Sequence, residues 1–155
     1  MDKEITIRYQ EFDNVQDMVE TDRQLLLFAQ EASHSAYAPY SHFHVGAAAL
    51  LDDGTVVKGS NQENMAYPSG LCAERTTLFA ASANYPNQKI VSLAIAAQNP
   101  DGSWVEASPC GACRQVMAEI QQRQQQPLRV IVLLNGSRVR CYPNVESLLP
   151  FLFSM

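Results

Sequence analysis

The 155-residue sequence lacks several features that would define the class of the protein at once. It has no run of basic residues, since its 11 lysines and arginines are scattered, and 16 acidic residues give a formal net charge of −5. Proteins that bind long nucleic acids carry a basic stripe, so we expect a small-molecule partner and no nucleic acid. No apolar stretch is long enough to cross a bilayer, so we expect no membrane partner.

A secretory signal and abundant cysteine are also missing. The N-terminal residues MDKEITIRYQEF lack the long apolar core of a signal peptide, so a cytoplasmic location is expected. In a reducing compartment, closely spaced cysteines are more often metal ligands or catalytic groups than disulfide partners. The chain has only four cysteines, which are Cys72, Cys110, Cys113 and Cys141.

Helical and strand patterns alternate along the rest of the chain. The length and the 46% share of hydrophobic residues fit one domain with a sizeable core. Helix and strand patterns in alternation predict helices on both faces of one sheet. Helices are expected over residues 21–37, 72–83, from 110 onward and over 144–153, and five strands within 43–64, 89–98 and 128–142.

Local signals add detail at the ends of these elements. Thr21 and Gln24 fit a capping box at the start of the first helix. The dipeptides Asp53-Gly54 and Asn135-Gly136 are favoured hairpin turns, so the last two strands are expected to form an antiparallel pair.

The N-terminal segment is interpreted separately from this pattern. Its alternating Ile5, Ile7 and Tyr9 predict an edge strand or an arm against a neighbouring molecule, and a flexible tail is an open alternative. We therefore expect a single domain over residues 1–155, of which residues 1–20 form an N-terminal arm.

Three of the cysteines have the spacing of a metal site. Cys110 and Cys113 form a Cys-x-x-Cys pair, and Pro109 stops any preceding helix, so both thiols can lie at the first turn of a new one. Cys72 lies where another helix is expected to begin. Helix N-termini favour anions, and thiolate is the form of cysteine that binds metal. The three thiols together predict a Zn²⁺ site.

Two charged residues next to Cys72 suggest that this zinc site is catalytic. Structural zinc sites normally have four protein ligands, whereas catalytic sites have three and bind water at the fourth position. Glu74 is expected to take and return the protons of that water. Arg75 is expected to donate to a ligand thiolate and offset its charge. Cys141 lies in a predicted strand and is expected to be a buried structural thiol.

The motifs CAER at 72–75 and PCGACRQ at 109–115 resemble those of the cytidine deaminases, in their small homotetrameric zinc-dependent form. The resemblance extends from about residue 22 to the C-terminus. It implies a three-layer α/β/α fold with a mixed five-stranded sheet, one Zn²⁺ per chain and a tetramer. It also implies hydrolytic deamination of cytidine or deoxycytidine to uridine or deoxyuridine plus ammonia, in pyrimidine salvage.

The resemblance assigns substrate contacts to further residues. The segment GSNQEN matches the family's Asn-x-Glu pair, so Asn61 and Glu63 would bind the ribose hydroxyls, and strand alternation puts both on one face. Without the resemblance, these two residues would be interpreted as a solvated strand end.

The same resemblance assigns contacts with the base. Phe43 would pack against the pyrimidine, although alone it would be interpreted as a core residue. Backbone groups near Ala73 would orient the amino group of the base. Tyr67 matches a tyrosine that relatives contribute to a neighbouring subunit, and Phe153 would close over the base in another subunit, or merely plug the core.

Three other functions remain open from the sequence. Deaminases of blasticidin-type antibiotics are similar around the zinc motif, but the intact NQE and CAER segments favour an ordinary nucleoside. Editing of polynucleotides would need a basic and aromatic channel, which the net charge disfavours. A zinc-stapled binding protein without turnover would not need Glu74 and would gain from a fourth protein ligand.

Overall fold

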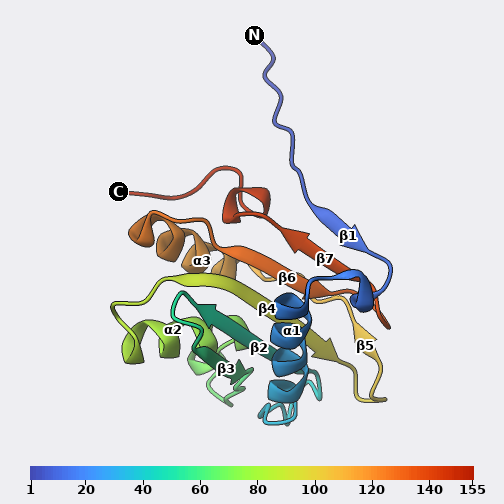
Figure 1. The fold of residues 1–155 in the computed structure, drawn as a ribbon. Helices are drawn as coiled ribbons and strands as arrows, with labels where there is room; N and C mark the ends of the chain where they lie inside the picture. The colour runs from blue at the N-terminus through green and yellow to red at the C-terminus, as the bar shows by residue number, and fades with distance from the viewer.

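The protein has three layers, with one mixed sheet between helices. A computed structural model describes all residues 1–155. Helix α1 (Glu20–Ser33) covers one face of the sheet, and helices α2 (Ala73–Asn84) and α3 (Gly111–Gln124) cover the other (Figure 1). The arrangement confirms the predicted three-layer α/β/α fold.

The sheet has seven strands, where five were expected. The order is β1-β7-β6-β4-β2-β3, with β5 paired to β4. Strands β4 and β6 are parallel, and all other pairs, including the predicted β6–β7 hairpin, are antiparallel. The strands are β1 (Gln10–Phe12), β2 (His44–Leu51), β3 (Val56–Ser60), β4 (Ile90–Gln98), β5 (Trp104–Val105), β6 (Arg129–Leu133) and β7 (Val139–Tyr142).

The predicted start of the first helix is wrong. Helix α1 begins at Glu20, and its N-cap, Val19, makes no capping bond with its side chain. Thr21 therefore lies inside the helix, and Gln24 donates to the Glu20 carboxylate instead of closing a capping box. The helix also ends at Ser33, four residues before the predicted end at Tyr37.

The predicted final helix is also wrong. Only a single 3-10 turn forms there, η3 (Val145–Ser147), where the Asn144 side chain accepts from the Ser147 backbone N–H. Pro150 follows and lacks the N–H that a longer helix would need. Two other such turns are η1 (Val15–Asp17) and η2 (Tyr67–Ser69).

Strand β4 forms the centre of the core because both of its faces are buried. Leu93 and Ile95 pack in the cluster that α2 and α3 share with the sheet, whereas Ala94 and Ala96 pack in the cluster beneath α1. The small side chains of Ala94 and Ala96 let α1 lie close to the sheet, whereas the larger side chains of Leu93 and Ile95 fill the space under α2 and α3.

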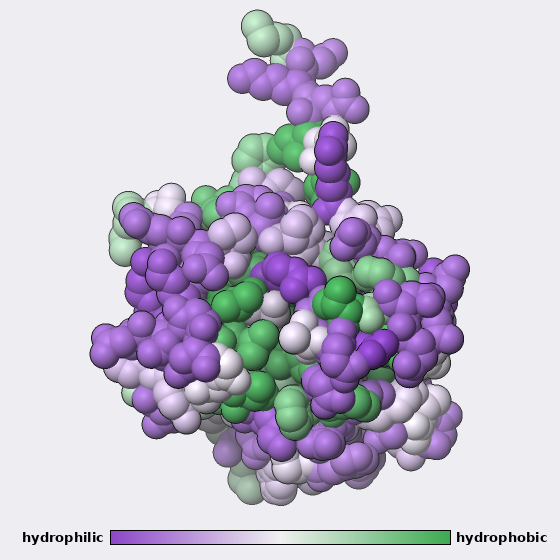
Figure 2. All heavy atoms as spheres, in the orientation of Figure 1, coloured by the Kyte–Doolittle hydropathy of each residue, from purple (hydrophilic) through white to green (hydrophobic).

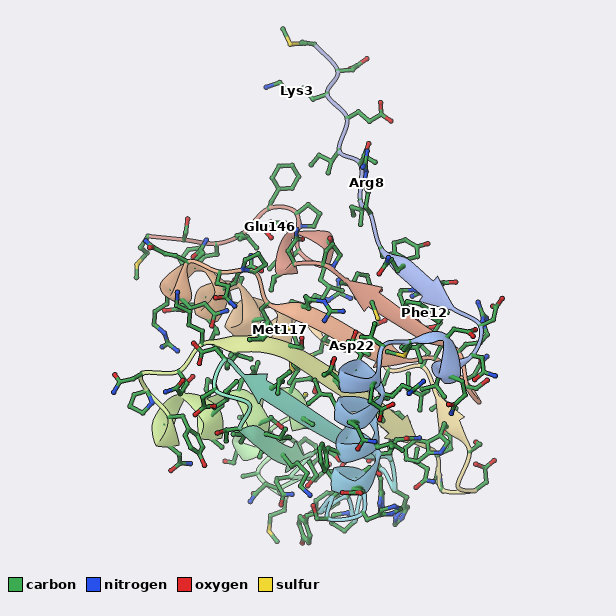
Figure 3. The ribbon with its side chains drawn as sticks, in the orientation of Figure 1. Lys3, Arg8, Phe12, Asp22, Met117 and Glu146 are labelled. Carbon is green, nitrogen blue, oxygen red and sulfur yellow. The ribbon has the colours of Figure 1, made fainter.

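A buried ion pair fixes the start of α1 on the sheet. Asp22 is only 6% exposed, and its carboxylate accepts from both terminal nitrogens of Arg129 on β6, at 2.8 and 3.1 Å. Figure 3 shows Asp22 at this end of α1, beside the sheet. The hydrogen bond to Asp22 raises the pKa of Arg129. This two-bond geometry sets orientation as well as distance.

The N-terminal arm joins the sheet through three residues in its middle. Residues 10–12 form β1, which pairs with the edge of β7, and the preceding residues extend away from the body (Figures 1 and 2). The ring of Tyr9 lies tilted against that of Tyr142, with 6.0 Å between the ring centroids, and Glu11 forms ion pairs with Arg138 and Arg140. No helix is both long and apolar enough to cross a membrane.

Replacing Gly46 by alanine is expected to lower the free energy of unfolding by about 3 kcal/mol, near the upper end for overpacked sites. Gly46 lies on β2 against α1, where a Cβ would collide with the Ala29 carbonyl oxygen and the Ser33 nitrogen, both backbone atoms. The control is Gly54→Ala, which meets no atom within 4 Å and strains only a φ of +89°. The Gly54→Ala substitution should lower the free energy of unfolding by about 1 kcal/mol. Equal losses in urea titrations of the two variants would contradict the close contact.

Candidate active site

The two helices on one face of the sheet begin at neighbouring points, and cysteine occupies both starts. Cys72 is the N-cap of α2 and Cys110 is the N-cap of α3, and neither side chain makes a capping hydrogen bond. N-caps are usually Ser, Thr, Asp or Asn, whose side chains bond to the helix. These two thiols are instead free to bind another group. Cys113, in the first turn of α3, is fully buried.

The three thiols fit one zinc ion. The Cys72 and Cys110 sulfurs are 3.8 Å apart, those of Cys110 and Cys113 are 3.5 Å apart, and all three lie within 4.8 Å of one another. Tetrahedral zinc with Zn–S bonds of about 2.3 Å separates its sulfurs by about 3.8 Å. Cysteine, moreover, is among the ligands that zinc prefers. No histidine or carboxylate joins this cluster as a fourth ligand.

Arg75 lies against these thiols, as the sequence predicts. Its Nη2 atom donates to the Cys72 sulfur at 3.4 Å, and this hydrogen bond raises the pKa of the guanidinium. Its Nε atom is buried without a hydrogen-bond partner. A buried donor without a partner costs free energy, so more negative charge at the thiols would stabilise Arg75. This orphaned donor is a second reason why the cluster fits metal-bound thiolates.

The site shifts the pKa values of Cys72 and Glu74 in opposite directions. Interaction with the Cys113 thiol, helped by Arg75, lowers the pKa of Cys72 to about 5 and favours its thiolate. Burial raises the pKa of Glu74, which is only 5% exposed, and the nearby Cys72 charge adds to the effect. A carboxyl group with a raised pKa can hold a proton closer to neutral pH, as a general acid–base residue must.

A cavity of about 510 Å³ opens beside the thiols. Cys72 and Arg75 form part of its wall, which places the predicted metal site next to space for a small molecule. The lining also contains the predicted residues Asn61, Glu63 and Tyr67, and the unpredicted residues Tyr40, Ser41, Gln62, Asn64, Gly70 and Leu71.

Asn61 and Glu63 line this cavity, and their side chains also form hydrogen bonds with nearby backbone groups. The Asn61 amide accepts from the Val45 N–H at 2.8 Å and donates to the Phe43 carbonyl at 2.9 Å. One carboxylate oxygen of Glu63 accepts from the backbone N–H groups of Tyr40 and Ser41, at 3.0 and 3.2 Å. Hydrogen bonding from Ser41 is the main cause that lowers the pKa of Glu63.

The other predicted substrate residues do not line the cavity within one chain. Phe43 is half-buried, and its backbone carbonyl accepts from the Asn61 amide, whereas Ala73 is fully buried at the start of α2. Phe153 is 69% exposed near the C-terminus. Tyr67 does line the cavity but is 82% exposed.

Sequence reasoning missed Tyr40 and Ser41. They lie in the loop before β2, and they reach the cavity through hydrogen bonds to Glu63, a residue more than twenty positions away. The segment APYS carries no motif of its own, so only the folded structure reveals this contact.

Three convergent thiols, a buried carboxyl group and an adjoining cavity define a zinc-dependent enzyme that acts on a small molecule. Residues 19–126 match the family described as the cytidine and deoxycytidylate deaminase zinc-binding region. The cytidine deaminase of Halalkalibacterium halodurans is 47% identical over 100 residues, which are 64% of this chain and 72% of that protein.

Solved structures agree with this match. Cytidine deaminase from Burkholderia pseudomallei covers 88% of this chain and 100% of its own, at 37% identity and a TM-score of 0.74. The Mycobacterium tuberculosis enzyme covers 89% and 100%, at 35% identity and a TM-score of 0.67. The chain belongs to the cytidine and deoxycytidylate deaminase family, which confirms the resemblance in its sequence.

Removing one thiol should remove the metal. We expect Cys113→Ala to reduce bound zinc from one ion per chain to nearly none, because two remaining thiols cannot complete the site. The matched control is Cys141→Ala, which removes a thiol that is equally buried but lies on β7, outside the cluster. It should keep one zinc per chain, as metal analysis of the purified variants would show. Full zinc in Cys113→Ala would contradict the ligand set.

Proposed function

We propose that this protein hydrolyses cytidine and deoxycytidine at C4 of the base, releasing ammonia and leaving uridine or deoxyuridine. The observation that carries the proposal is the buried Glu74 carboxyl group beside three thiols that fit zinc, in a chain of the deaminase family. A zinc site that served only to staple the fold would have no use for this carboxyl group.

Cys72, Cys110 and Cys113 would hold the metal, and Glu74 would carry protons. Bound zinc supplies a Lewis acid that makes water reactive at neutral pH. Glu74 takes a proton from the attacking water and gives it to N3 of the base. The oxygen of this water bonds to C4 of the base. The carboxyl group then moves the second proton of that oxygen to the amino group, the C4–N bond breaks, and ammonia leaves while a carbonyl group forms at C4. The raised pKa of Glu74 suits both directions of transfer.

Arg75 would keep this site from becoming too negative. Three thiolates around a divalent ion leave one net negative charge, which weakens the ion as a Lewis acid. The Arg75 guanidinium donates to Cys72 and withdraws part of that charge. Both helix N-termini act in the same direction.

Asn61 and Glu63 would bind the sugar. Both line the cavity, and each keeps hydrogen-bonding capacity beyond its contacts with the backbone. One oxygen of Glu63 already accepts two N–H groups, so the other is available for a ribose hydroxyl. The carboxylate thus shapes the loop and binds the sugar at once.

The base would be held by residues of more than one chain. Phe43 would pack against the pyrimidine, and the backbone at Ala73 would orient its amino group. Tyr67 and Phe153 are large and exposed within one chain, which supports contacts with neighbouring subunits. We therefore include a homotetramer in the proposal.

The proposal also covers the organisation of the chain and its compartment. We treat residues 1–155 as a single domain, with residues 1–20 as an N-terminal arm. All four cysteines are unpaired, and three reduced thiols are needed for the metal. A reducing compartment maintains such thiols, which supports a cytoplasmic location.

Glu74→Gln should abolish turnover and keep zinc. The amide has nearly the same shape but cannot accept and return protons, so kcat should fall by about 10²–10⁴-fold. Zinc per chain and the fall in ultraviolet absorbance with cytidine or deoxycytidine would be measured on one preparation. Cys141→Ala serves as the active control.

Each other outcome of that experiment has a definite meaning. Turnover that survives in Glu74→Gln would overturn the proton-transfer role. A wild-type protein with zinc but no turnover of either nucleoside would overturn the substrate assignment. Turnover of a blasticidin-type nucleoside alone would replace it with the modified substrate.

Glu63→Gln should raise KM for cytidine by about 10–100-fold with a small change in kcat, because a charged hydrogen bond to the sugar is lost. The amide oxygen can still accept from Tyr40 and Ser41, so the loop should keep its shape. Free cytosine, which has no sugar, is the control substrate, and its turnover should not change. Equal loss with both substrates would show that Glu63 acts on the loop alone.

A further inference from the structure

We propose that Arg114 is a positioning residue that sets the direction of the metal ligand Cys110 and ties the metal-binding turn to the C-terminal segment. The proposal rests on the function given above, because it assumes that Cys110 holds zinc. Arg114 touches neither the thiols nor the cavity lining, so it acts through other residues.

The side chain of Arg114 bonds to two backbone carbonyls from distant parts of the chain. Its Nε atom donates to the Pro109 carbonyl at 2.8 Å, and its Nη1 atom donates to the Leu148 carbonyl at 2.7 Å. It takes part in no ion pair. A guanidinium whose planar donors satisfy two carbonyls fixes their relative positions, as a single point charge could not.

The first of these carbonyls controls the direction of a zinc ligand. Pro109 is buried and directly precedes Cys110, so its carbonyl belongs to the peptide that leads into the ligand. Cys110 is exposed, and its thiol forms hydrogen bonds only with the two other thiols. The orientation of the Cys110 side chain is therefore set mainly by the backbone that leads into it. Fixing the Pro109 peptide fixes the direction in which the Cys110 side chain leaves the chain.

The second carbonyl belongs to the C-terminal segment, which α3 holds along its whole length. Gln121 accepts from the Val145 N–H at 3.0 Å and donates to Glu146 at 2.8 Å. Figure 3 shows Glu146 on η3, close to α3, which carries Met117. Farther along, Gln115 donates to the Phe153 carbonyl at 3.5 Å.

Arg114 is the point where this segment meets the metal-binding turn. Leu149 and Leu152 pack against the core beside Leu148, so the segment is a firm support and not a loose tail. Through the two bonds of Arg114, a shift of the segment moves the Pro109 carbonyl and hence Cys110. The segment continues to Phe153, the residue proposed to close over the base of another subunit.

The test compares zinc release from three variants. Arg114→Ala removes both bonds, and Arg114→Lys keeps the charge but offers one donor group in place of a planar fork. The control is Arg123→Ala at the other end of α3, which loses only a 3.1 Å bond to the Ser82 hydroxyl. Each protein, loaded with zinc, is mixed with the chelator 4-(2-pyridylazo)resorcinol, and the rate of zinc transfer is followed by absorbance.

Arg114→Ala is expected to release zinc about 10–100-fold faster than the wild type, with Arg114→Lys between them and Arg123→Ala unchanged. With cytidine, kcat should fall more than KM rises. Urea unfolding of the zinc-loaded proteins measures any general loss of stability. If Arg114→Ala is destabilised but releases zinc at the wild-type rate, Arg114 only supports the fold and the proposal is overturned.

The zinc measurement needs no substrate, so its result is independent of the assignment of cytidine. Repeating it in the Glu74→Gln background removes turnover altogether. Faster release there would support the positioning role even for an inactive protein. Should Arg114→Ala fail to fold, Arg114→Lys decides the question, and a wild-type release rate in that folded variant overturns the proposal.

Discussion

Parallel pairing between β4 and β6 is the constraint on which the candidate active site depends. Each of these strands follows a helix on the same face of the sheet, so α2 and α3 begin at the same edge. Their N-termini bring Cys72 and Cys110 within 3.8 Å of each other, although 38 residues separate them. Two positive helix ends at one point also reduce the repulsion among three thiolates. The topology therefore supplies both the proximity and the electrostatic support that a metal site needs.

Neighbouring residues in α2 experience this site in different ways. Interaction with the Cys113 thiol, helped by the hydrogen bond from Arg75, lowers the pKa of Cys72, which favours the charged form of this thiol. Glu74 is buried instead, and burial raises its pKa. A single helical turn thus holds one group that keeps its charge and another that can gain and lose a proton. This division of roles requires only the sequence CAER at a helix start and a core behind it.

The sequence predicted those parts that depend on local chemistry. The three clustered cysteines, Glu74 and Arg75 lie in short motifs, and the Asn135-Gly136 turn fixes a hairpin within a few residues. The predictions were wrong where contacts between distant parts of the chain determine the secondary structure. Strands β1 and β5 have three and two residues, too short to show alternation, and only their partners make them strands.

Errors at helix ends have the same origin. Thr21 and Gln24 match a capping box, but the ion pair of Asp22 with Arg129 holds the start of α1, and the helix begins one residue before Thr21. The chain after Asn144 has apolar residues at helical spacing, yet it packs on α3 as a single turn followed by extended chain. Apolar spacing predicts burial here but does not distinguish a helix from an irregular segment.

Polar side chains bond to the backbone on two sides of the site, in addition to apolar packing. On one side the Glu63 carboxylate accepts two backbone N–H groups from the loop before β2. On the other, the Arg114 guanidinium donates to two backbone carbonyls. A sugar hydroxyl bound by Glu63, or a metal bound by Cys110, would act on one of these side chains or on the peptide next to it. Under the proposals above, binding at the centre would therefore be linked to the order of both surrounding segments, through bonds that are directional and individually weak.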